Sequence, residues 1–230
     1  VSVWAADGTL IRDFIGPTGY GGTGANADPD DPSRVFGSGC EFRLDWQANR
    51  AVVVARLGPV EGELLKCGGR EYVMSKGGRL YLRRGDSLRL VAAMGNPCVK
   101  DYKDELALFQ LPPAPPGTHG YASISFVWSD LNDDGAPQPE EVASGSKWSG
   151  WETLKCPVGT SGYFGGYWLD EAFSLYGVAG ESHGAHGGRP AMVTKIPLKG
   201  WTPGGAPVWD IAAQQILSDG GRIGGCLYLP

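Results

Sequence analysis

Short segments rich in β-branched and aromatic residues recur along the whole chain, and glycine, proline, aspartate or asparagine bounds them. Short apolar runs separated by turn residues predict β-strands. We find no pattern of a long amphipathic helix, and only residues 211–217 fit a short helical turn. The clearest predicted strands are residues 41–46, 51–57, 70–75, 79–83, 88–94, 123–129, 167–170, 173–178, 191–196 and 207–210.

Turn sequences of the hairpin type lie between these strands, at residues 6–8 (ADG), 76–78 (KGG) and 84–86 (RGD). Such turns predict that neighbouring strands pair antiparallel. Residues 70–95 read as three strands in a row, and residues 163–210 read as four strands with a glycine-rich insertion. A four-stranded unit of about 40 to 50 residues is typical of the blade of a β-propeller.

A tryptophan followed closely by an acid ends three of the strands, at spacings of about 40 residues. Blade-like repeats would produce this pattern, with the ring packed between blades and the acid capping the next turn. The pairs are Trp128 with Asp130, Trp168 with Asp170, and Trp209 with Asp210. We therefore predict an all-β fold, a β-propeller of four to five blades that is complete or part of a larger one. A β-sandwich with long loops is the alternative.

The composition agrees with a globular β protein that has many turns. The chain has 230 residues, with 37 glycines, 17 prolines, 8 tryptophans and 10% aromatic residues. We predict one propeller-like domain over residues 1–230, with a proline-rich connection at residues 111–117 and a surface loop at residues 16–39.

Charge and hydropathy exclude two classes of partner. A formal net charge of -5 without a long basic run is not the footprint of a nucleic-acid binder. No segment has the roughly 18 consecutive apolar residues of a membrane-spanning helix. We expect a secreted or extracellular protein, with the periplasm or a cell surface as further possibilities, whose export signal is removed or lies outside this sequence.

The cysteines are far apart and form no C-x-x-C pair, which argues against a zinc site or a thioredoxin-like motif. Two interpretations remain open: up to two internal disulfides with one thiol left over, or small buried hydrophobic residues. The five are Cys40, Cys67, Cys98, Cys156 and Cys226.

The most specific motif is a twelve-residue loop at residues 130–141 that fits the pattern D-x-[DN]-x-[DN]-G-x5-E of calcium-binding loops. Its hard oxygen ligands suit Ca²⁺ better than a transition metal. The predicted ligands are Asp130, Asn132, Asp134, Ala136 through its carbonyl, Gln138 and Glu141. A strand precedes the loop where an EF-hand has a helix, so we expect the ion to fix a turn; an acidic turn without metal is the alternative.

Three segments carry a resemblance to a known group of proteins. Residues 126–142 resemble the calcium-loop segments of secreted NHL-like or FG-GAP-like propeller proteins of environmental bacteria. Residues 196–210 look like their blade-closing segments, and residues 20–34 look like one of their loops. The resemblance implies a secreted β-propeller and implies no particular activity.

No established catalytic motif occurs in the sequence. His183 and His186, with Glu181, have a spacing that could bind a transition metal, but a solvent-exposed glycine-rich loop is the simpler interpretation, and His119 is isolated. Acids at strand ends leave a glycosidase-type pair open, although such acids usually cap turns. These acids are Asp45, Asp170, Glu171 and Asp210.

Aromatic residues gather near the glycine-rich loops, where they could form a platform on which sugar rings stack. The predicted ligand-binding residues are Trp148, Trp151, Tyr163, Tyr167 and Trp168, with Phe164 beside them. Packing between blades is the competing role for these rings.

We therefore expect a calcium-stabilised extracellular binding or scaffold module, with polysaccharide as the favoured ligand. The alternatives are a polysaccharide lyase or glycoside hydrolase with its site at the propeller axis, and a structural subunit that joins other chains or blades. Convergent acids in a pocket would favour the enzyme, and an exposed aromatic shelf would favour the binding module.

Overall fold

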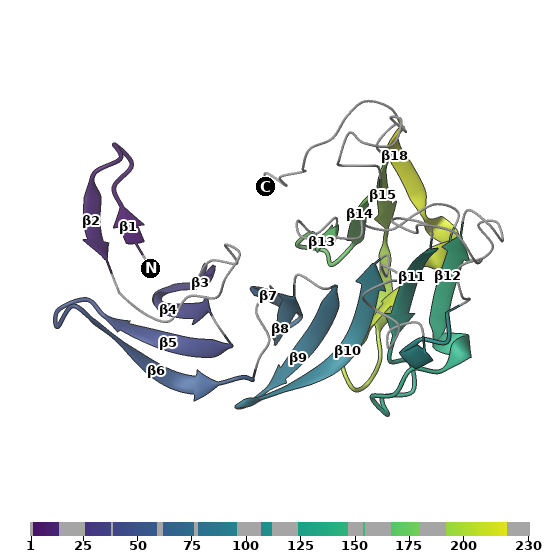
Figure 1. Ribbon diagram of the computed structural model, residues 1–230, viewed down its shortest axis with the longest axis horizontal. Helices are drawn as coiled ribbons and strands as arrows, with labels where there is room; N and C mark the ends of the chain where they lie inside the picture. Colours follow the sequence, from purple (N-terminus) through teal and green to yellow (C-terminus); the bar gives the residue numbers. More distant parts are fainter. Residues whose placement is uncertain are drawn as a thin grey trace. The chain divides into compact units, whose positions relative to one another are not determined.

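The computed structural model describes residues 2–13, 26–37, 39–58, 62–75, 78–95, 107–111, 124–146, 154, 167–179 and 192–219 (Figure 1). The fold is all-β, as predicted, and consists of several antiparallel sheets. Within the described residues, none of these sheets closes into a barrel. No helix in this part of the chain has the length and apolar character needed to cross a membrane.

The chain forms two compact units, which we describe separately. The first comprises Val1–Lys76 with Tyr81–Arg89, and the second comprises Gly77–Leu80 with Leu90–Pro230.

The first unit begins with a hairpin, followed by a four-stranded antiparallel sheet whose strands pair in chain order. The hairpin strands are β1 (Ser2–Trp4) and β2 (Leu10–Asp13). The sheet strands are β3 (Asn26–Asp28), β4 (Asp31–Gly37), β5 (Cys40–Asp45) and β6 (Arg50–Arg56). The unit continues with β7 (Gly62–Cys67) and β8 (Arg70–Ser75), which also pair antiparallel.

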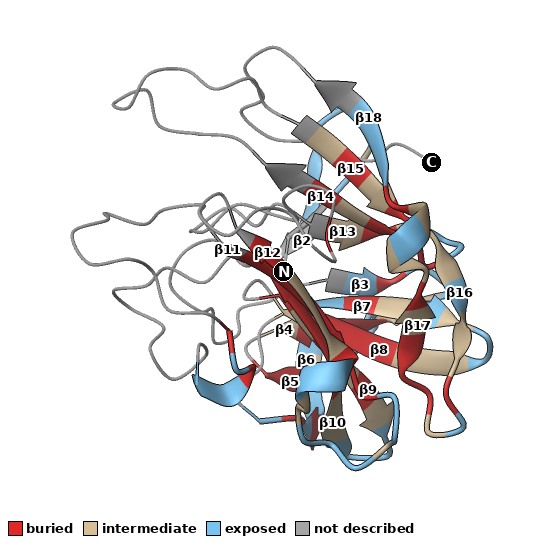
Figure 2. Cartoon of the chain, turned by 90° about the vertical axis from the view of Figure 1, so that its right-hand side faces the viewer, coloured by how far each residue is buried: buried red, intermediate tan, exposed pale blue. Residues whose placement is uncertain are grey.

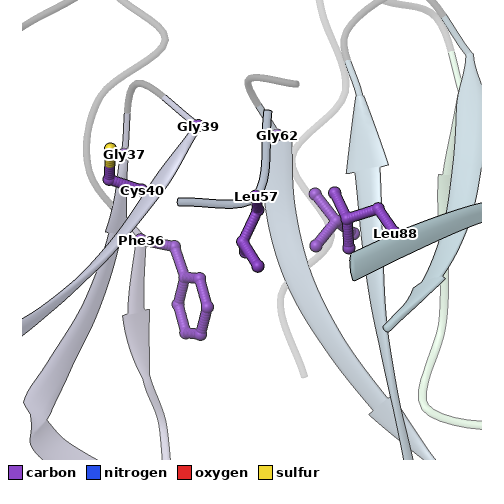
Figure 3. A pocket seen from close by; sticks show the side chains of 8 residues that line it. Phe36, Gly37, Gly39, Cys40, Leu57, Gly62 and Leu88 are labelled. Atoms are coloured by element: carbon purple, nitrogen blue, oxygen red, sulfur yellow. The ribbon is translucent and has the colours of Figure 1, made fainter. Parts of the chain in front are cut away.

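Both faces of β4 are buried, because its successive residues Val35 and Phe36 belong to different core clusters. Val35 packs with Phe42 and Leu44 of β5, whereas Phe36 packs with Leu57 and its neighbours. Phe36 and Leu57 also line a small apolar cavity (Figure 3). At about 10 Å³ it holds no more than about one water molecule, so it is a packing gap and not a ligand site.

The next strands along the chain are β9 (Arg79–Arg84), β10 (Ser87–Gly95), β11 (Ile124–Ser129) and β12 (Val142–Ser146). Residues 92–95 of β10 pair antiparallel with β11, and β11 pairs antiparallel with β12. In the second unit, Phe126 and Trp128 of β11 pack with Phe109, Leu111 and Ala93 in a core cluster.

The second unit also contains a four-stranded sheet of order β13-β14-β15-β18 and a two-stranded hairpin, β16-β17. The sheet strands are β13 (Tyr167–Leu169), β14 (Leu175–Ala179), β15 (Met192–Ile196) and β18 (Gln215–Asp219). The hairpin strands are β16 (Leu198–Trp201) and β17 (Pro207–Trp209). Short 3-10 turns lie at Pro139–Glu141 and Ile211–Ala213.

All ten predicted strands are present, with ends displaced by at most two residues, and β8 has the predicted bounds. The surface loop predicted at residues 16–39 was wrong in part, because β3 and β4 lie within it and bury Arg34, Val35 and Phe36. The helical turn predicted at residues 211–217 was also wrong in part, since only Ile211–Ala213 is helical and β18 follows. The fourth strand of the last sheet is therefore β18, and residues 207–210 belong to the hairpin.

Two of the five cysteines lie in the described residues, and neither takes part in a disulfide. Cys40 is buried in the core of the first unit and Cys67 is partly exposed. Cys98, Cys156 and Cys226 lie outside the described residues, as does the proline-rich segment 112–117.

Candidate metal-binding loop and aromatic row

The predicted calcium loop connects β11 to β12, two adjacent antiparallel strands of the second unit. The loop leaves the sheet just after Trp128 and returns at Val142, and these two residues pair directly across the strands. Asp133 and Gly135 have positive φ angles of 63° and 77°. The pairing of Trp128 with Val142 therefore closes the base of the loop. The glycine that the motif requires, Gly135, has the positive φ angle that glycine adopts readily.

Glu141, the last predicted ligand, lies at this base and its carboxylate accepts four N–H groups. Oε1 accepts from the backbone of Leu131 at 2.8 Å and Asn132 at 3.1 Å. Oε2 accepts from Trp128 Nε1 at 2.9 Å and the Gln138 backbone at 3.4 Å. The residue is only 7% exposed, and none of the described cations pairs with it. A carboxylate offers about four acceptor positions, so Glu141 already holds both ends of the loop.

Asp130, the first predicted ligand, is fully buried. Its backbone N–H donates to the carbonyl of Val91 at 3.0 Å, which ties the start of the loop to β10. Its Oδ1 accepts the backbone N–H of Gly135 at 3.1 Å. This bond joins loop positions 1 and 6 and turns the carboxylate towards the inside of the loop.

The side chains at loop positions 3, 5 and 9 meet one another. Asn132 Nδ2 lies 3.0 Å from Asp134 Oδ2 and 3.4 Å from Gln138 Oε1, and Gln138 Nε2 lies 2.8 Å from Asp134 Oδ2. The N–H of Ala136, at 2.8 Å from Asp134 Oδ1, is the main cause that lowers the pKa of this carboxyl; burial opposes it and the two amides assist it. Asp134 is thus a carboxylate at neutral pH.

The predicted side-chain ligands thus fall into two groups. Asp130 and Glu141 are buried carboxylates at the two ends of the loop, and the side chains of Asn132, Asp134 and Gln138 contact one another. In the described part of the chain, no three His, Cys, Asp or Glu side chains form a group suited to a metal. The loop draws its oxygens from amides and a backbone carbonyl as well as from carboxylates, which is the donor mixture typical of Ca²⁺ sites.

Asp133 is a structural residue of the loop that the sequence did not single out. Its carboxylate accepts hydrogen bonds from Thr202 Oγ1 at 2.6 Å and from the Gly204 backbone at 2.7 Å. Both partners lie in the turn of the β16-β17 hairpin, and Thr202 Oγ1 also accepts the Ala206 N–H at 2.9 Å. The loop motif leaves position 4 unspecified, and Asp133 is one of two acids in the loop, with Glu140, that the motif does not require.

Only one predicted sugar-binding aromatic has a described side chain. Trp148, Trp151 and Tyr163 lie outside the described residues, and Tyr167 is described only as part of the β13 backbone. Trp168 is partly exposed and stacks on Tyr176 of β14, with ring centroids 5.0 Å apart and an interplanar angle of 9°.

A charged pair lies next to this stack. Tyr176 donates its hydroxyl to Asp170 Oδ2 at 3.1 Å, and Lys195 Nζ lies 3.6 Å from the same oxygen. Lys195 Nζ is also 5.1 Å from the centroid of the Tyr176 ring. Interaction with the Tyr176 hydroxyl raises the pKa of Lys195, against the effect of burial and with help from Asp170.

Three of the four candidate acids of a glycosidase site serve as turn caps. Asp45 Oδ1 accepts the N–H groups of Gln47 and Ala48, Asp170 Oδ1 accepts that of Ser174, and Asp210 Oδ1 accepts that of Ala213. Glu171 is exposed. His119, His183, His186 and Glu181 lie outside the described residues.

A second cluster of charges, not anticipated from the sequence, is buried in the first unit around Arg34. Its Nε donates to Glu41 at 2.7 Å, its Nη1 to Asp28 at 3.0 Å and its Nη2 to Glu71 at 2.8 Å. Arg83 lies 2.5 Å from Glu41, and Lys66 lies 2.5 Å from Asp28. Because Arg34 donates to all three carboxylates, this cluster is a structural clasp and offers no open ligand position.

Comparison with known protein families, curated proteins and solved structures finds no match to this chain.

Proposed function

We propose that the chain is a calcium-stabilised extracellular binding or scaffold module, in which Ca²⁺ bound by residues 130–141 fixes the connection between β11 and β12. The observation that carries this proposal is the convergence of Asn132, Asp134 and Gln138 above the buried carboxylates of Asp130 and Glu141. A divalent cation would draw on the hard oxygen donors that the loop supplies from carboxylates, amides and a backbone carbonyl.

Glu141 sets a condition on this binding. Its two oxygens already accept four N–H groups, so direct ligation requires it to release at least part of that set. Glu141 therefore keeps the loop ordered without an ion, and a bound ion would stabilise the loop further. This favours a structural calcium site over one that orders the loop from a disordered state.

For the overall architecture we propose a β-propeller, complete or part of a larger one. Support comes from the four-stranded antiparallel sheets and from the acids that follow the strand-end tryptophans, since Asp130, Asp170 and Asp210 each accept a backbone N–H of the next turn. A β-sandwich with long loops is the alternative, and a scattering profile of the purified chain would distinguish a disc-shaped particle from an elongated one.

The calcium proposal is tested by titrating the purified chain with Ca²⁺ in a calorimeter and by measuring its melting temperature in Ca²⁺ and in chelator. We expect saturable binding and a higher melting temperature in Ca²⁺. Asp130→Ala and Glu141→Ala should lower the melting temperature in Ca²⁺ and abolish its response to chelator. Asp134→Ala, at an exposed position, removes this oxygen ligand and is a milder variant that should fold and lose most of the response.

Asp86→Ala is the matched control, because Asp86 is an exposed acid in the turn between β9 and β10. It should leave the calcium response unchanged. Equal melting temperatures of the wild-type chain in Ca²⁺ and chelator, without heat of binding, would remove calcium from the proposal.

The favoured ligand is a polysaccharide, supported by the partly exposed aromatic stack of Trp168 and Tyr176. The test is retention of the chain on insoluble and gel-embedded polysaccharides, in Ca²⁺ and in chelator, with an assay for newly released sugar ends. Retention without product supports a binding module, and product would establish a lyase or hydrolase. Loss of both signals would favour a structural subunit that joins other chains.

A further inference from the structure

The four-stranded sheet of the second unit has one face in the core. Leu169, Leu175 and Ile196 are direct partners across β13, β14 and β15, and they are 8%, 0% and 0% exposed. Because side chains alternate across a strand, the residues before or after them in sequence lie on the opposite face.

That opposite face carries a row of four residues in register across the whole sheet. Trp168 pairs with Tyr176, Tyr176 pairs with Lys195, and Lys195 pairs with Gln215. The first three are partly exposed and Gln215 is exposed. Figure 2 shows the burial along the strands of this sheet, in which the described part of β18 is largely exposed. The row is thus a continuous accessible strip that begins with two aromatic rings and ends with two hydrogen-bonding side chains.

We propose that this strip, Trp168-Tyr176-Lys195-Gln215 with Asp170 beside it, is a binding site for a neutral polysaccharide. The proposal deepens the proposed function and rests on its choice of polysaccharide as ligand. A pyranose ring has an apolar face of C–H groups, which stacks on an aromatic ring, and a rim of hydroxyl groups, which need donors and acceptors. Tyr176 lies between Trp168 and Lys195, so the sugar ring would stack on the face of Trp168 turned away from Tyr176. Lys195, Gln215 and Asp170 supply the hydrogen-bonding partners, and the mixture is typical of ligand sites.

The charges of the strip decide between neutral and anionic chains. Lys195 lies 3.6 Å from Asp170, so its positive charge is already compensated within the protein. An acidic polysaccharide would need an uncompensated cation, whereas hydroxyl groups need only hydrogen-bonding partners. Lys195 and Gln215 can donate to hydroxyl oxygens, and Gln215 can also accept.

The strip is also held in place before any ligand binds. Asp170 accepts the Ser174 N–H at 2.7 Å and the Tyr176 hydroxyl at 3.1 Å, and these bonds fix the ring on which Trp168 stacks. Side chains fixed in advance lose less conformational entropy on binding.

The test compares the retention and affinity of variants on neutral polysaccharides such as cellulose, a β-1,3-glucan and a mannan, with their soluble oligosaccharides as probes. Trp168→Ala should weaken binding about tenfold or more, as expected when a central aromatic contact is lost. Trp168→Phe should keep most of the affinity, because it retains a ring and the Trp168 Nε1 has no acceptor among the described residues. Lys195→Met should weaken binding several-fold.

Trp4→Ala is the matched control, since Trp4 is an exposed tryptophan of the first unit, 58% exposed. It should bind like the wild-type chain, and far-UV and near-UV circular dichroism should show that every variant is folded. If Trp168→Ala binds as tightly as the wild-type chain, or if Trp4→Ala loses binding equally, the strip is not the site. If the wild-type chain binds calcium and no neutral polysaccharide, the strip and the choice of ligand are both overturned while the calcium site stands.

Discussion

The carboxylate of Asp133 occupies the space that a side chain of residue 204 would fill. Oδ2 accepts the Gly204 N–H at 2.7 Å, and a Cβ at that position would lie 2.1 Å from Oδ1. Asp133 has a φ of 63°, which is uncommon for a residue with a side chain. Tertiary contacts must compensate for such strain, and here the β16-β17 turn provides them.

Gly204→Ala should therefore destabilise the protein by about 1–3 kcal/mol, because the new methyl group displaces Asp133 from its two hydrogen-bond donors. Urea unfolding followed by tryptophan fluorescence measures the change. Gly200→Ala is the matched control in the preceding strand, where a Cβ meets no atom within 4 Å. Equal stabilities of the two variants would show that the contact contributes nothing.

The stability of the first unit should fall steeply in acid. Burial opposes the charged form of Asp28, but hydrogen bonds from Lys66, the Asp30 N–H and Arg34 outweigh it and lower the pKa of Asp28 to about 2. A carboxyl with a depressed pKa contributes its stability above the pKa of the unfolded chain, near 4, and loses it as the pH falls through its folded value. The contribution is about 2 kcal/mol at neutral pH and disappears between about pH 5 and pH 2.

Urea unfolding of the wild-type chain and of Asp28→Asn between pH 7 and pH 2 tests this linkage. The variant should be less stable at pH 7 and should converge with the wild-type chain near pH 2. Asp86→Asn, at an exposed position of the same unit, should follow the wild-type curve. Parallel curves for wild type and Asp28→Asn would show that this carboxyl has no depressed pKa.

The sequence predicted the local elements well and the long-range contacts poorly. Residues 70–75 have the β-branched and aromatic composition of a strand, and β8 has those bounds. By contrast, β4 begins with Asp31 and Pro32, which are typical of a turn, and it was missed. Its strand conformation depends on burial of Val35 and Phe36 on both faces, and burial is a property of the folded chain.

The candidate sites show the same division. The calcium loop could be proposed because its predicted ligands lie within twelve consecutive residues. The contact of Asp133 with Thr202 spans 69 residues, and the Trp168-Tyr176-Lys195-Gln215 strip depends on the register of four strands. A pattern read along the chain carries neither distance nor register, so these two features required the structure.

Arg34 and Arg43 are direct partners across β4 and β5 but should contribute very differently to stability. Arg34→Met leaves the carboxylates of the buried clasp without their shared donor, and we expect a loss of about 3–5 kcal/mol. Arg43 pairs with Asp31 at the exposed surface, so Arg43→Met should cost less than about 1 kcal/mol. Thermal and urea unfolding measure both, and similar losses for the two variants would contradict a structural role specific to the clasp.

Glu141 should stabilise the loop even without calcium, because four N–H groups bind its carboxylate. In chelator, Glu141→Gln should lower the free energy of unfolding by about 1–3 kcal/mol, since its amide NH₂ faces donors where the carboxylate oxygen was an acceptor. Asp134→Ala, at an exposed position, should change stability in chelator less than Glu141→Gln does, and should mainly remove the response to calcium. Urea unfolding of both variants in chelator and in Ca²⁺ separates the two roles. A Glu141→Gln variant as stable as the wild-type chain in chelator would show that Glu141 acts through the ion alone.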